Sequence, residues 1–137
     1  MKTVVIIRHA KSSWDIATMS DFDRPLNHRG KTDAPLMAKK LLSKAGDIDA
    51  FISSPAKRAK ETAELFAEVF DKRKKEIIFH EELYHASAQT IYSVIKKTDN
   101  TFKSIAVFTH NPGITEFVNT LTNIKTDNMP TCGVFAV

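Results

Sequence analysis

The stretch Val4-Val5-Ile6-Ile7-Arg8-His9 decides the fold. Four consecutive β-branched residues without polar alternation are typical of a strand buried on both faces, as in a parallel sheet covered by helices. The charged and titratable side chains that follow directly lie at the carboxyl end of this strand, where open α/β sheets bind their ligands. The stretch therefore predicts a parallel α/β sheet with a site at its rim.

Strand and helix signals alternate along the rest of the chain. Further strands are expected at residues 50–53, 77–79, 104–109 and 134–137. Helices are expected at residues 27–44, from Ser54-Pro55 onward, at residues 87–97, and from Pro112 onward. About four rounds of this alternation predict an α/β fold, a three-layer α/β/α sandwich with a mostly parallel central sheet.

Local signals mark the ends of these helices. Asn27 and Ser87 are expected N-caps, and Ser54-Pro55 predicts an N-cap followed by proline in the first helical turn. Gly46 is an expected helix stop, and Pro35 predicts a kink or a later start of the first helix. The residues expected to face the core are Ala34, Met37, Ala38, Leu41, Leu42, Ala59, Ala63, Phe66, Phe70, Ala88, Ile91, Ile95, Ile114, Phe117, Val118 and Leu121.

Length and composition predict one globular domain over residues 1–137. Hydrophobic residues make up 42% and charged residues 26%, and the formal charge of +4 favours anionic partners. The single cysteine, Cys132, fits a reducing compartment, and the chain shows neither a leader-like nor a membrane-length apolar run. We therefore expect a cytoplasmic protein with no membrane partner. The basic run at residues 72–75 lacks interleaved aromatics, so no nucleic-acid partner is expected.

Polar side chains follow three of the predicted strands. Arg8 and His9 come after the first strand, Arg58 lies in the first turn of the helix after residues 50–53, and His110 follows residues 104–109. Guanidinium groups bind oxyanions through two parallel hydrogen bonds, and a helix N-terminus favours an anion. Histidine serves as nucleophile, base or cationic donor near neutral pH. Two arginines and two histidines at one rim predict a phosphoryl site with no metal and no cofactor.

Three stretches resemble, in order and spacing, the motifs of the histidine phosphatase superfamily, the phosphoglycerate-mutase-like fold. They are Arg8-His9-Ala10-Lys11-Ser12-Ser13-Trp14, then Ser53-Ser54-Pro55-Ala56-Lys57-Arg58-Ala59-Lys60-Glu61-Thr62-Ala63, and Thr109-His110-Asn111. Arg24-Pro25-Leu26 and Arg29-Gly30 resemble the short SixA-like branch of phosphohistidine phosphatases. The resemblance implies that His9 is the phosphorylated nucleophile, while Arg8, Arg58 and His110 hold the phosphoryl oxygens. We expect a backbone carbonyl to hold the second ring nitrogen of His9 and His110 to act as a charged donor.

The sequence departs from this pattern at the proton donor. Many relatives carry a glutamate where Leu83-Tyr84-His85 places His85. The alternatives for the acid are His85, Glu81 or Glu82 just before it, or no acid at all, with both glutamates as solvated loop carboxylates. An imidazole leaving group, with a pKa near 6.5, needs an enzymic acid less than an alkoxide does. The missing glutamate thus favours cleavage of a P–N bond. Asp15 stands where relatives carry an asparagine, and we expect it to face away from phosphate or pair with a basic residue.

The sequence supports one main hypothesis and leaves others open. We expect a phosphatase acting on a phosphorylated protein, a phosphohistidine carrier, with a small phosphate ester as the alternative substrate and a non-catalytic phosphate-binding module as the remote one. His80 and His85 are five residues apart and do not share a helix face, so they predict no zinc site. Cys132 is expected to be a small buried residue. The sequence does not fix the oligomeric state, and it is compatible with a monomer because nothing in it demands a dimer. It stops at Val137 inside a strand-like run, where a truncated chain is expected.

Overall fold

The computed structural model describes residues 3–13, 20–121 and 130–136. Within these ranges, five strands form one sheet in the order β3-β2-β4-β1-β5. The strands are β1 (Thr3–Arg8), β2 (Ala50–Ser53), β3 (Ile78–Phe79), β4 (Ser104–Thr109) and β5 (Val134–Ala136). Strands β1 to β4 pair in parallel, and β5 pairs antiparallel to β1. This arrangement confirms the predicted mostly parallel sheet.

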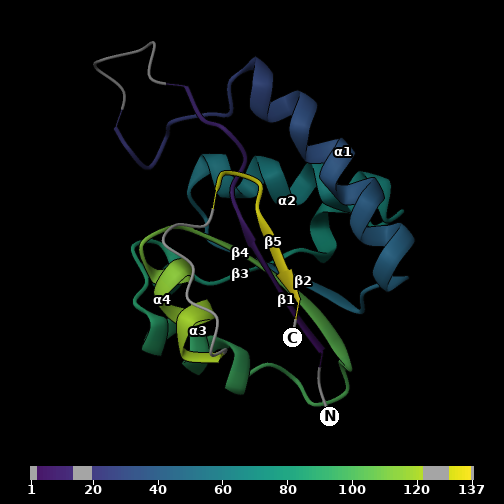
Figure 1. Cartoon of the computed structure of the whole chain (residues 1–137), viewed down its shortest axis with the longest axis vertical. Helices are drawn as coiled ribbons and strands as arrows, with labels where there is room; N and C mark the ends of the chain where they lie inside the picture. The colour runs from purple at the N-terminus through teal and green to yellow at the C-terminus, as the bar shows by residue number, and fades with distance from the viewer. Residues whose placement is uncertain (1–2, 14–19, 122–129, 137) are drawn as a thin grey trace.

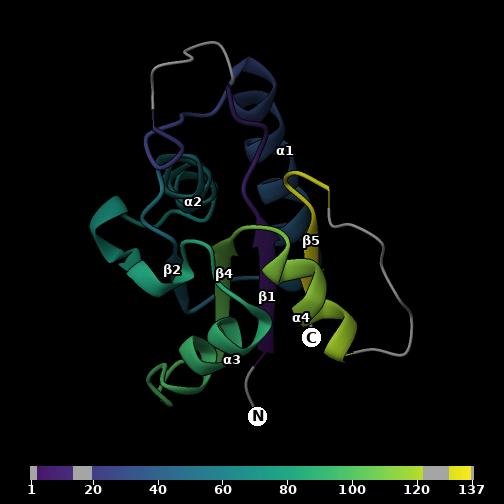
Figure 2. The same cartoon turned by 90° about the vertical axis from the view of Figure 1, so that its left-hand side faces the viewer.

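Helices cover both faces of this sheet (Figures 1 and 2). Helices α1 (His28–Ala45) and α2 (Lys57–Val69) lie on one face, and α3 (Ala88–Lys96) and α4 (Gly113–Leu121) on the other. Short 3-10 turns at Lys74–Glu76 and Glu81–Leu83 flank β3. The three layers are those that the alternation of strand and helix signals predicts.

The core divides into two halves because side chains alternate along β1. Val5 and Ile7 pack with the buried residues of α1 and α2, and Ile6 packs with those of α3 and α4. The continuous apolar run in β1 is therefore buried on both faces, as a parallel central strand requires. Among the described residues, no helix combines the length and apolar character needed to cross a bilayer.

The helix boundaries agree with most of the local signals. The side chains of Asn27 and Ser87 accept hydrogen bonds from the N–H groups of Gly30 and Thr90, as N-caps do. Gly46 ends α1 with a φ of 72°, a backbone conformation that favours glycine. The expected later start of α1 is wrong, since the helix begins at His28 and includes Pro35.

The expectation for Ser54 is also wrong. Helix α2 begins at Lys57 and its N-cap is Ala56. The Ser54 hydroxyl accepts the N–H of Ala56 over 3.3 Å, just before the helix, and lies 2.8 Å from Nε2 of His110 at the polar rim. Serine is favoured at N-caps because its hydroxyl binds nearby backbone N–H groups. Here the hydroxyl also has a partner 56 residues away in sequence, which a local pattern does not reveal.

Most side chains expected in the core are buried or packed against it. Leu121 is the exception, with 42% of its surface exposed, and it lines a shallow cavity beside Tyr92. Cys132 is buried, as expected. Gly30, within the SixA-like part of the sequence, has a physical role as well. A Cβ at this position would lie 2.2 Å from the carbonyl oxygen of Lys11, so α1 approaches the segment after His9 closely at Gly30.

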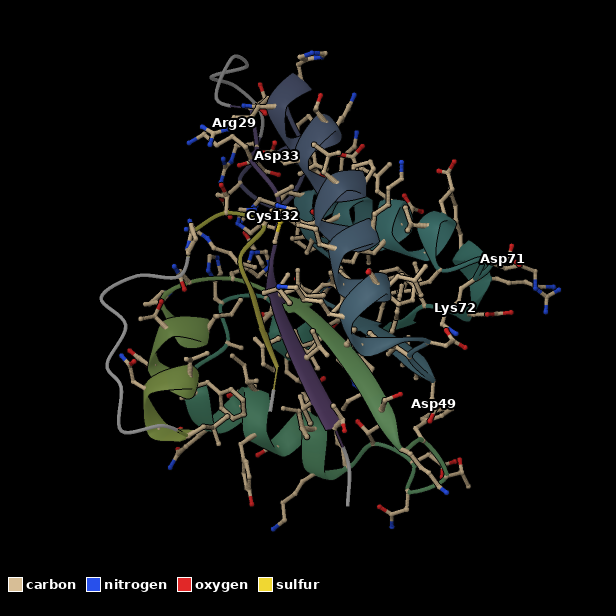
Figure 3. The ribbon with its side chains drawn as sticks, turned by 45° about the vertical axis from the view of Figure 1, so that its right-hand side comes forward. Arg29, Asp33, Asp49, Asp71, Lys72 and Cys132 are labelled. Atoms are coloured by element: carbon tan, nitrogen blue, oxygen red, sulfur yellow. The ribbon has the colours of Figure 1, made fainter. Side chains whose placement is uncertain are left out.

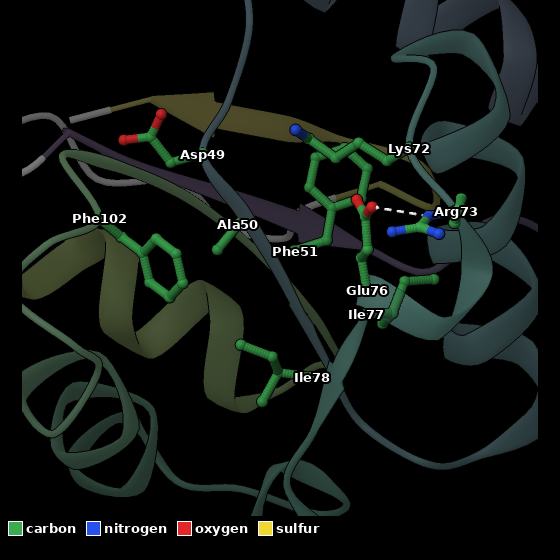
Figure 4. A pocket seen from close by; sticks show the side chains of 9 residues that line it. All are labelled: Asp49, Ala50, Phe51, Lys72, Arg73, Glu76, Ile77, Ile78 and Phe102. Carbon is green, nitrogen blue, oxygen red and sulfur yellow. Dashed lines mark hydrogen bonds and ion pairs between the residues drawn. The ribbon is translucent and has the colours of Figure 1, made fainter.

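A cleft of about 320 Å³ lies at the amino ends of the strands, away from the polar rim (Figure 4). Its charged side chains have structural partners. Arg73 pairs with Glu76, Lys72 pairs with Asp47, and the Asp49 carboxylate accepts the N–H groups of two residues at the start of β4. The basic run at residues 72–75 thus has two of its charges paired, in keeping with a surface turn.

Candidate active site

The register of the sheet brings the three polar segments together. Arg8 of β1 lies opposite Thr109 of β4, and Ser53 of β2 lies opposite Phe108. Beyond these pairs, the His9 N–H donates to the Thr109 carbonyl over 3.2 Å, and the Ser54 N–H donates to the Phe108 carbonyl over 2.9 Å. The residues that follow β1, β2 and β4 therefore meet at one rim, as the topology predicts.

His9 is held as a neutral nucleophile. Its Nδ1 lies 2.8 Å from the Ala10 carbonyl oxygen, which only accepts, so Nδ1 carries the proton and Nε2 carries the lone pair. The side chain is buried. Burial lowers the pKa of His9 to about 4, against the Ala10 hydrogen bond, and the nearby arginine charges, Arg58 first, add to the shift. The expectation that a backbone carbonyl holds the second nitrogen is confirmed.

Backbone contacts fix the segment that carries His9. The Ala10 N–H donates to Oγ1 of Thr62 over 2.9 Å, and Thr62 in turn donates to the Arg58 carbonyl. On the other side, the N–H of Cys132 donates to the His9 carbonyl over 3.0 Å. The nucleophile is thus braced by α2 and by the turn that enters β5.

Arg58 points its guanidinium at the nucleophile. Its Nε lies 3.4 Å from Nε2 of His9 and donates toward it, and its side chain is only 5% exposed. Its place in the first turn of α2, at the positive end of the helix dipole, adds to the attraction for an anion. A phosphoryl group bonded to His9 Nε2 would therefore meet this guanidinium directly.

Arg8 is the second guanidinium at this rim. It is the last residue of β1 and lies close enough to Arg58 for the two charges to interact. Burial lowers the pKa of Arg8, and the positive charge of Arg58 lowers it further. Two like charges held close together favour an anion between them, because the anion relieves their repulsion.

His110 completes the group, with its ring centroid 5.2 Å from that of His9. Burial lowers the pKa of His110 to about 2, and the positive charges of Arg58 and of His9 in its protonated form lower it further. The expectation of a charged donor is therefore wrong for the protein alone, because desolvation outweighs any attraction from the rim. The His110 Nδ1 atom is buried without a hydrogen-bond partner among the described residues, while Nε2 contacts Ser54. A neutral ring that accepts from Ser54 leaves Nδ1–H as the donor for a phosphoryl oxygen.

Asp21 and Tyr84 are rim residues that the sequence did not reveal. The Arg58 guanidinium donates to the Asp21 carboxylate over 3.1 Å and to the Asp21 backbone carbonyl over 2.7 Å. The Tyr84 hydroxyl donates to the same carboxylate over 2.7 Å, and the Tyr84 ring lies 5.7 Å from that of His110. Asp21 lies in a loop with no periodic signal, so its only sequence clue is its nearness to Arg24-Pro25-Leu26.

The three candidates for a proton donor differ in their surroundings. Glu82 forms an ion pair with Lys97 over 2.6 Å, and this hydrogen bond lowers the pKa of the exposed carboxyl. Glu81 is exposed at the start of a 3-10 turn. The His85 ring packs against that of Tyr84, with ring centroids 3.9 Å apart and the planes tilted by 34°. His85 is thus linked to the rim through Tyr84. Asp15 lies outside the described residues.

Cys132 lies behind the nucleophile but is chemically inert. Figure 3 shows it beside the first turns of α1, where it lines the same cavity as Asp33. Burial raises the pKa of its thiol to about 12, with the charge of Asp33 adding to the shift. Because the thiolate is the nucleophile in cysteine chemistry, this thiol is unreactive near neutral pH.

The pKa of His9 gives a prediction for titration. The ring should stay neutral, with its proton on Nδ1, down to about pH 4. The unfolded chain would take up this proton near pH 6.5 and so binds more protons than the folded chain below that pH. His9 therefore lowers the free energy of unfolding as the pH falls from about 6.5 to about 4. Nitrogen-15 chemical shifts of the imidazole, assigned with His9→Ala, measure both pKa and tautomer, and a midpoint near 6.5 would contradict the buried neutral state.

Comparison with solved structures finds chains of the same fold. SixA from Agrobacterium tumefaciens superposes with a TM-score of 0.86 at 26% identity, over 98% of this chain and 90% of that one. The protein histidine phosphatase SixA in complex with tungstate superposes with a TM-score of 0.85 at 24% identity, over 98% and 86% of the two chains. The second likeness, at this identity, shows the fold alone.

Sequence comparison leads to the same family. A protein of Arabidopsis thaliana named probable 2-carboxy-D-arabinitol-1-phosphatase is 31% identical over 100 residues, which are 70% of this chain and 20% of that protein. The chain spans less than a third of the length of the first curated relatives that it matches. The model of the histidine phosphatase superfamily (branch 1) matches residues 4–91, which include Arg8, His9 and Arg58. The chain belongs to branch 1 of the histidine phosphatase superfamily.

Proposed function

We propose that this protein is a phosphatase that forms a phosphohistidine intermediate on His9 and acts on phosphohistidine in a protein. One observation carries the proposal. The Nε2 lone pair of His9 lies in a buried site, held in place by the Ala10 carbonyl and faced by the Arg58 guanidinium 3.4 Å away. Phosphoryl transfer depends on alignment and charge stabilisation, and this arrangement offers both.

The proposed reaction has two steps. In the first, the Nε2 lone pair of His9 attacks phosphorus, the bond to the leaving group breaks, and its electron pair goes to the leaving atom. His9 is then an N-phosphorylated imidazolium that still holds its Nδ1 proton against Ala10. In the second, a water oxygen attacks phosphorus and the P–N bond breaks. Its electron pair returns to Nε2, so His9 leaves as the same neutral tautomer, and both water protons stay on the released phosphate. Arg8, Arg58 and the Nδ1–H of His110 hold the phosphoryl oxygens in both steps.

The choice of a phosphohistidine substrate rests on the leaving group. The register position of the expected glutamate holds His85, and the Glu82 carboxylate pairs with Lys97. An imidazole that is already protonated on its far nitrogen leaves as a neutral molecule and needs no proton from the enzyme. The likeness to SixA from Agrobacterium tumefaciens supports the same choice. The partner is then a phosphorylated carrier protein, and the alternative is a small phosphate ester, which the Arabidopsis relative favours by name.

Competition between substrates tests this choice. We expect kcat/KM for a phosphohistidine carrier protein to exceed that for sugar phosphates by at least roughly tenfold, because the ester leaving group lacks a proton donor. The comparison uses the same enzyme preparation with phosphate release as the readout. Equal rates on the two classes would favour the small-ester alternative. If the protein binds inorganic phosphate but turns over no substrate, the remaining hypothesis is a non-catalytic phosphate-binding module.

A further inference from the structure

The carboxylate of Asp21 lies at this anion-binding rim and has no role in the proposed reaction. The two oxygens of Asp21 are shared among three donors. Oδ2 accepts from Arg58 and Tyr84, and Oδ1 lies 3.2 Å from the guanidinium of Arg24. Even so, 42% of the side chain is exposed. The carboxylate is therefore open to a bound molecule as well as to its protein partners.

The presence of this charge has a cost for phosphate binding. A phosphoryl dianion near Arg58 is repelled by the Asp21 carboxylate, which contacts the same guanidinium. Partial burial would raise the pKa of Asp21, but the Tyr84 hydrogen bond and the Arg58 charge outweigh it and bring that pKa to about 2. The carboxylate is thus ionised at neutral pH and repels any second anionic group of a substrate.

We propose, on the basis of the function proposed above, that Asp21 is a specificity-determining residue whose carboxylate selects phosphoryl compounds with a cationic leaving group over those with a second anion. The favoured class contains phosphohistidine with a protonated ring and other phosphoramidates. The disfavoured class contains phosphorylated carboxylic acids and bisphosphates. The carboxylate attracts the positive charge of the first class and repels the negative charge of the second.

The surroundings of Asp21 suit a flat cation. Tyr84 donates its hydroxyl to Asp21 and packs edge-on against Phe22, with ring centroids 5.1 Å apart. Phe22 is 38% exposed. An imidazolium that approaches the phosphoryl site from this side meets the Asp21 carboxylate together with the partly exposed Phe22 ring, which is a favourable setting for such a cation. When the P–N bond breaks, its electron pair neutralises the ring, and neutral imidazole leaves.

Binding of matched phosphonates tests the proposal without any turnover. The probes are 2-aminoethylphosphonate and 3-phosphonopropionate, which share a two-carbon linker and differ in the charge of the far end, with ethylphosphonate as the uncharged reference. Calorimetry on the wild-type protein should show the ammonium compound binding most tightly and the carboxylate compound least. Asp21→Asn keeps an oxygen acceptor for Arg58 and removes the charge, so it should shrink this preference by roughly fivefold to tenfold. Asp21→Glu, which restores the charge, should restore the preference.

Asp23 supplies the matched control. It lies in the same loop, is exposed, and accepts a hydrogen bond from Ser20 over 2.8 Å. Asp23→Asn makes the same change in net charge and should leave the preference as in the wild type. The proposal is overturned if the wild type shows no preference, if Asp21→Asn weakens all three probes equally, or if Asp23→Asn has the same effect as Asp21→Asn. If the wild-type protein shows the binding preference but does not hydrolyse phosphohistidine, the proposed function is wrong and the selectivity of Asp21 is not.

Discussion

His9→Ala should lower kcat/KM for every substrate by at least about a thousandfold, because it removes the atom that bonds to phosphorus. No other described side chain has the same placement. A backbone carbonyl fixes the tautomer of His9, whereas Nδ1 of His110 has no such partner among the described residues. The pKa of the Cys132 thiol is raised to about 12. The measurement is hydrolysis of a chromogenic phosphate ester and of a phosphohistidine carrier protein. Alanine fits at this position because the segment is held through its main chain. The Ala10 N–H donates to Thr62, and the carbonyl of residue 9 accepts from the Cys132 N–H.

A matched control separates chemistry from folding in this experiment. His28 is an exposed histidine at the start of α1, and none of the contacts described for His9 involves it. His28→Ala should retain the wild-type rate, and both variants should unfold at temperatures close to that of the wild type. Residual activity within tenfold of the wild type in His9→Ala would show that another group attacks phosphorus.

Arg58→Lys should cost about 2–4 kcal/mol in transition-state stabilisation while keeping the positive charge. The guanidinium makes directed contacts from separate nitrogens. Nε faces His9, and the two terminal nitrogens reach Asp21. A lysine ammonium is a single point charge and cannot serve both sides. The loss should appear in kcat/KM for all phosphate compounds, since each presents the same phosphoryl group.

Arg73→Lys is the control for this substitution. Arg73 is exposed and pairs with Glu76 at the opposite end of the strands, so its change should leave kcat/KM unaltered. The thermal midpoint of Arg58→Lys should be measured as well, because Arg58 is buried. A near-neutral effect of Arg58→Lys on kcat/KM in a folded protein would place Arg58 outside the site.

Strands and helix ends that depend on local sequence were predictable. The run in β1 contains only apolar β-branched residues, and residues 104–109 and 50–53 match β4 and β2 in both bounds. Asn27 and Ser87 cap their helices because the partner N–H group lies three residues ahead in the chain. The meeting of Arg8, His9, Arg58 and His110 followed from topology, since parallel strands end at a common rim.

Contacts between distant segments were not predictable in the same way. Ser54 has the pattern of an N-cap, but its hydroxyl reaches His110. Asp21 meets Arg58 across 37 residues and Tyr84 across 63, and no periodicity signals either contact. The neutral state of His110 depends on burial that only the packed rim provides. Local patterns predict elements, whereas charge states and polar networks depend on the tertiary structure.

The most direct test of the account is to find the phosphoryl group on the protein. His110→Ala removes a donor to the phosphoryl oxygens and should slow turnover, so that labelled substrate leaves one phosphoryl group trapped on the enzyme. Quenched samples, analysed by peptide mass spectrometry and phosphorus NMR, should place this group on Nε2 of His9, with loss in acid and none in His9→Ala/His110→Ala. An acid-stable label, or a label on another residue, would contradict the account.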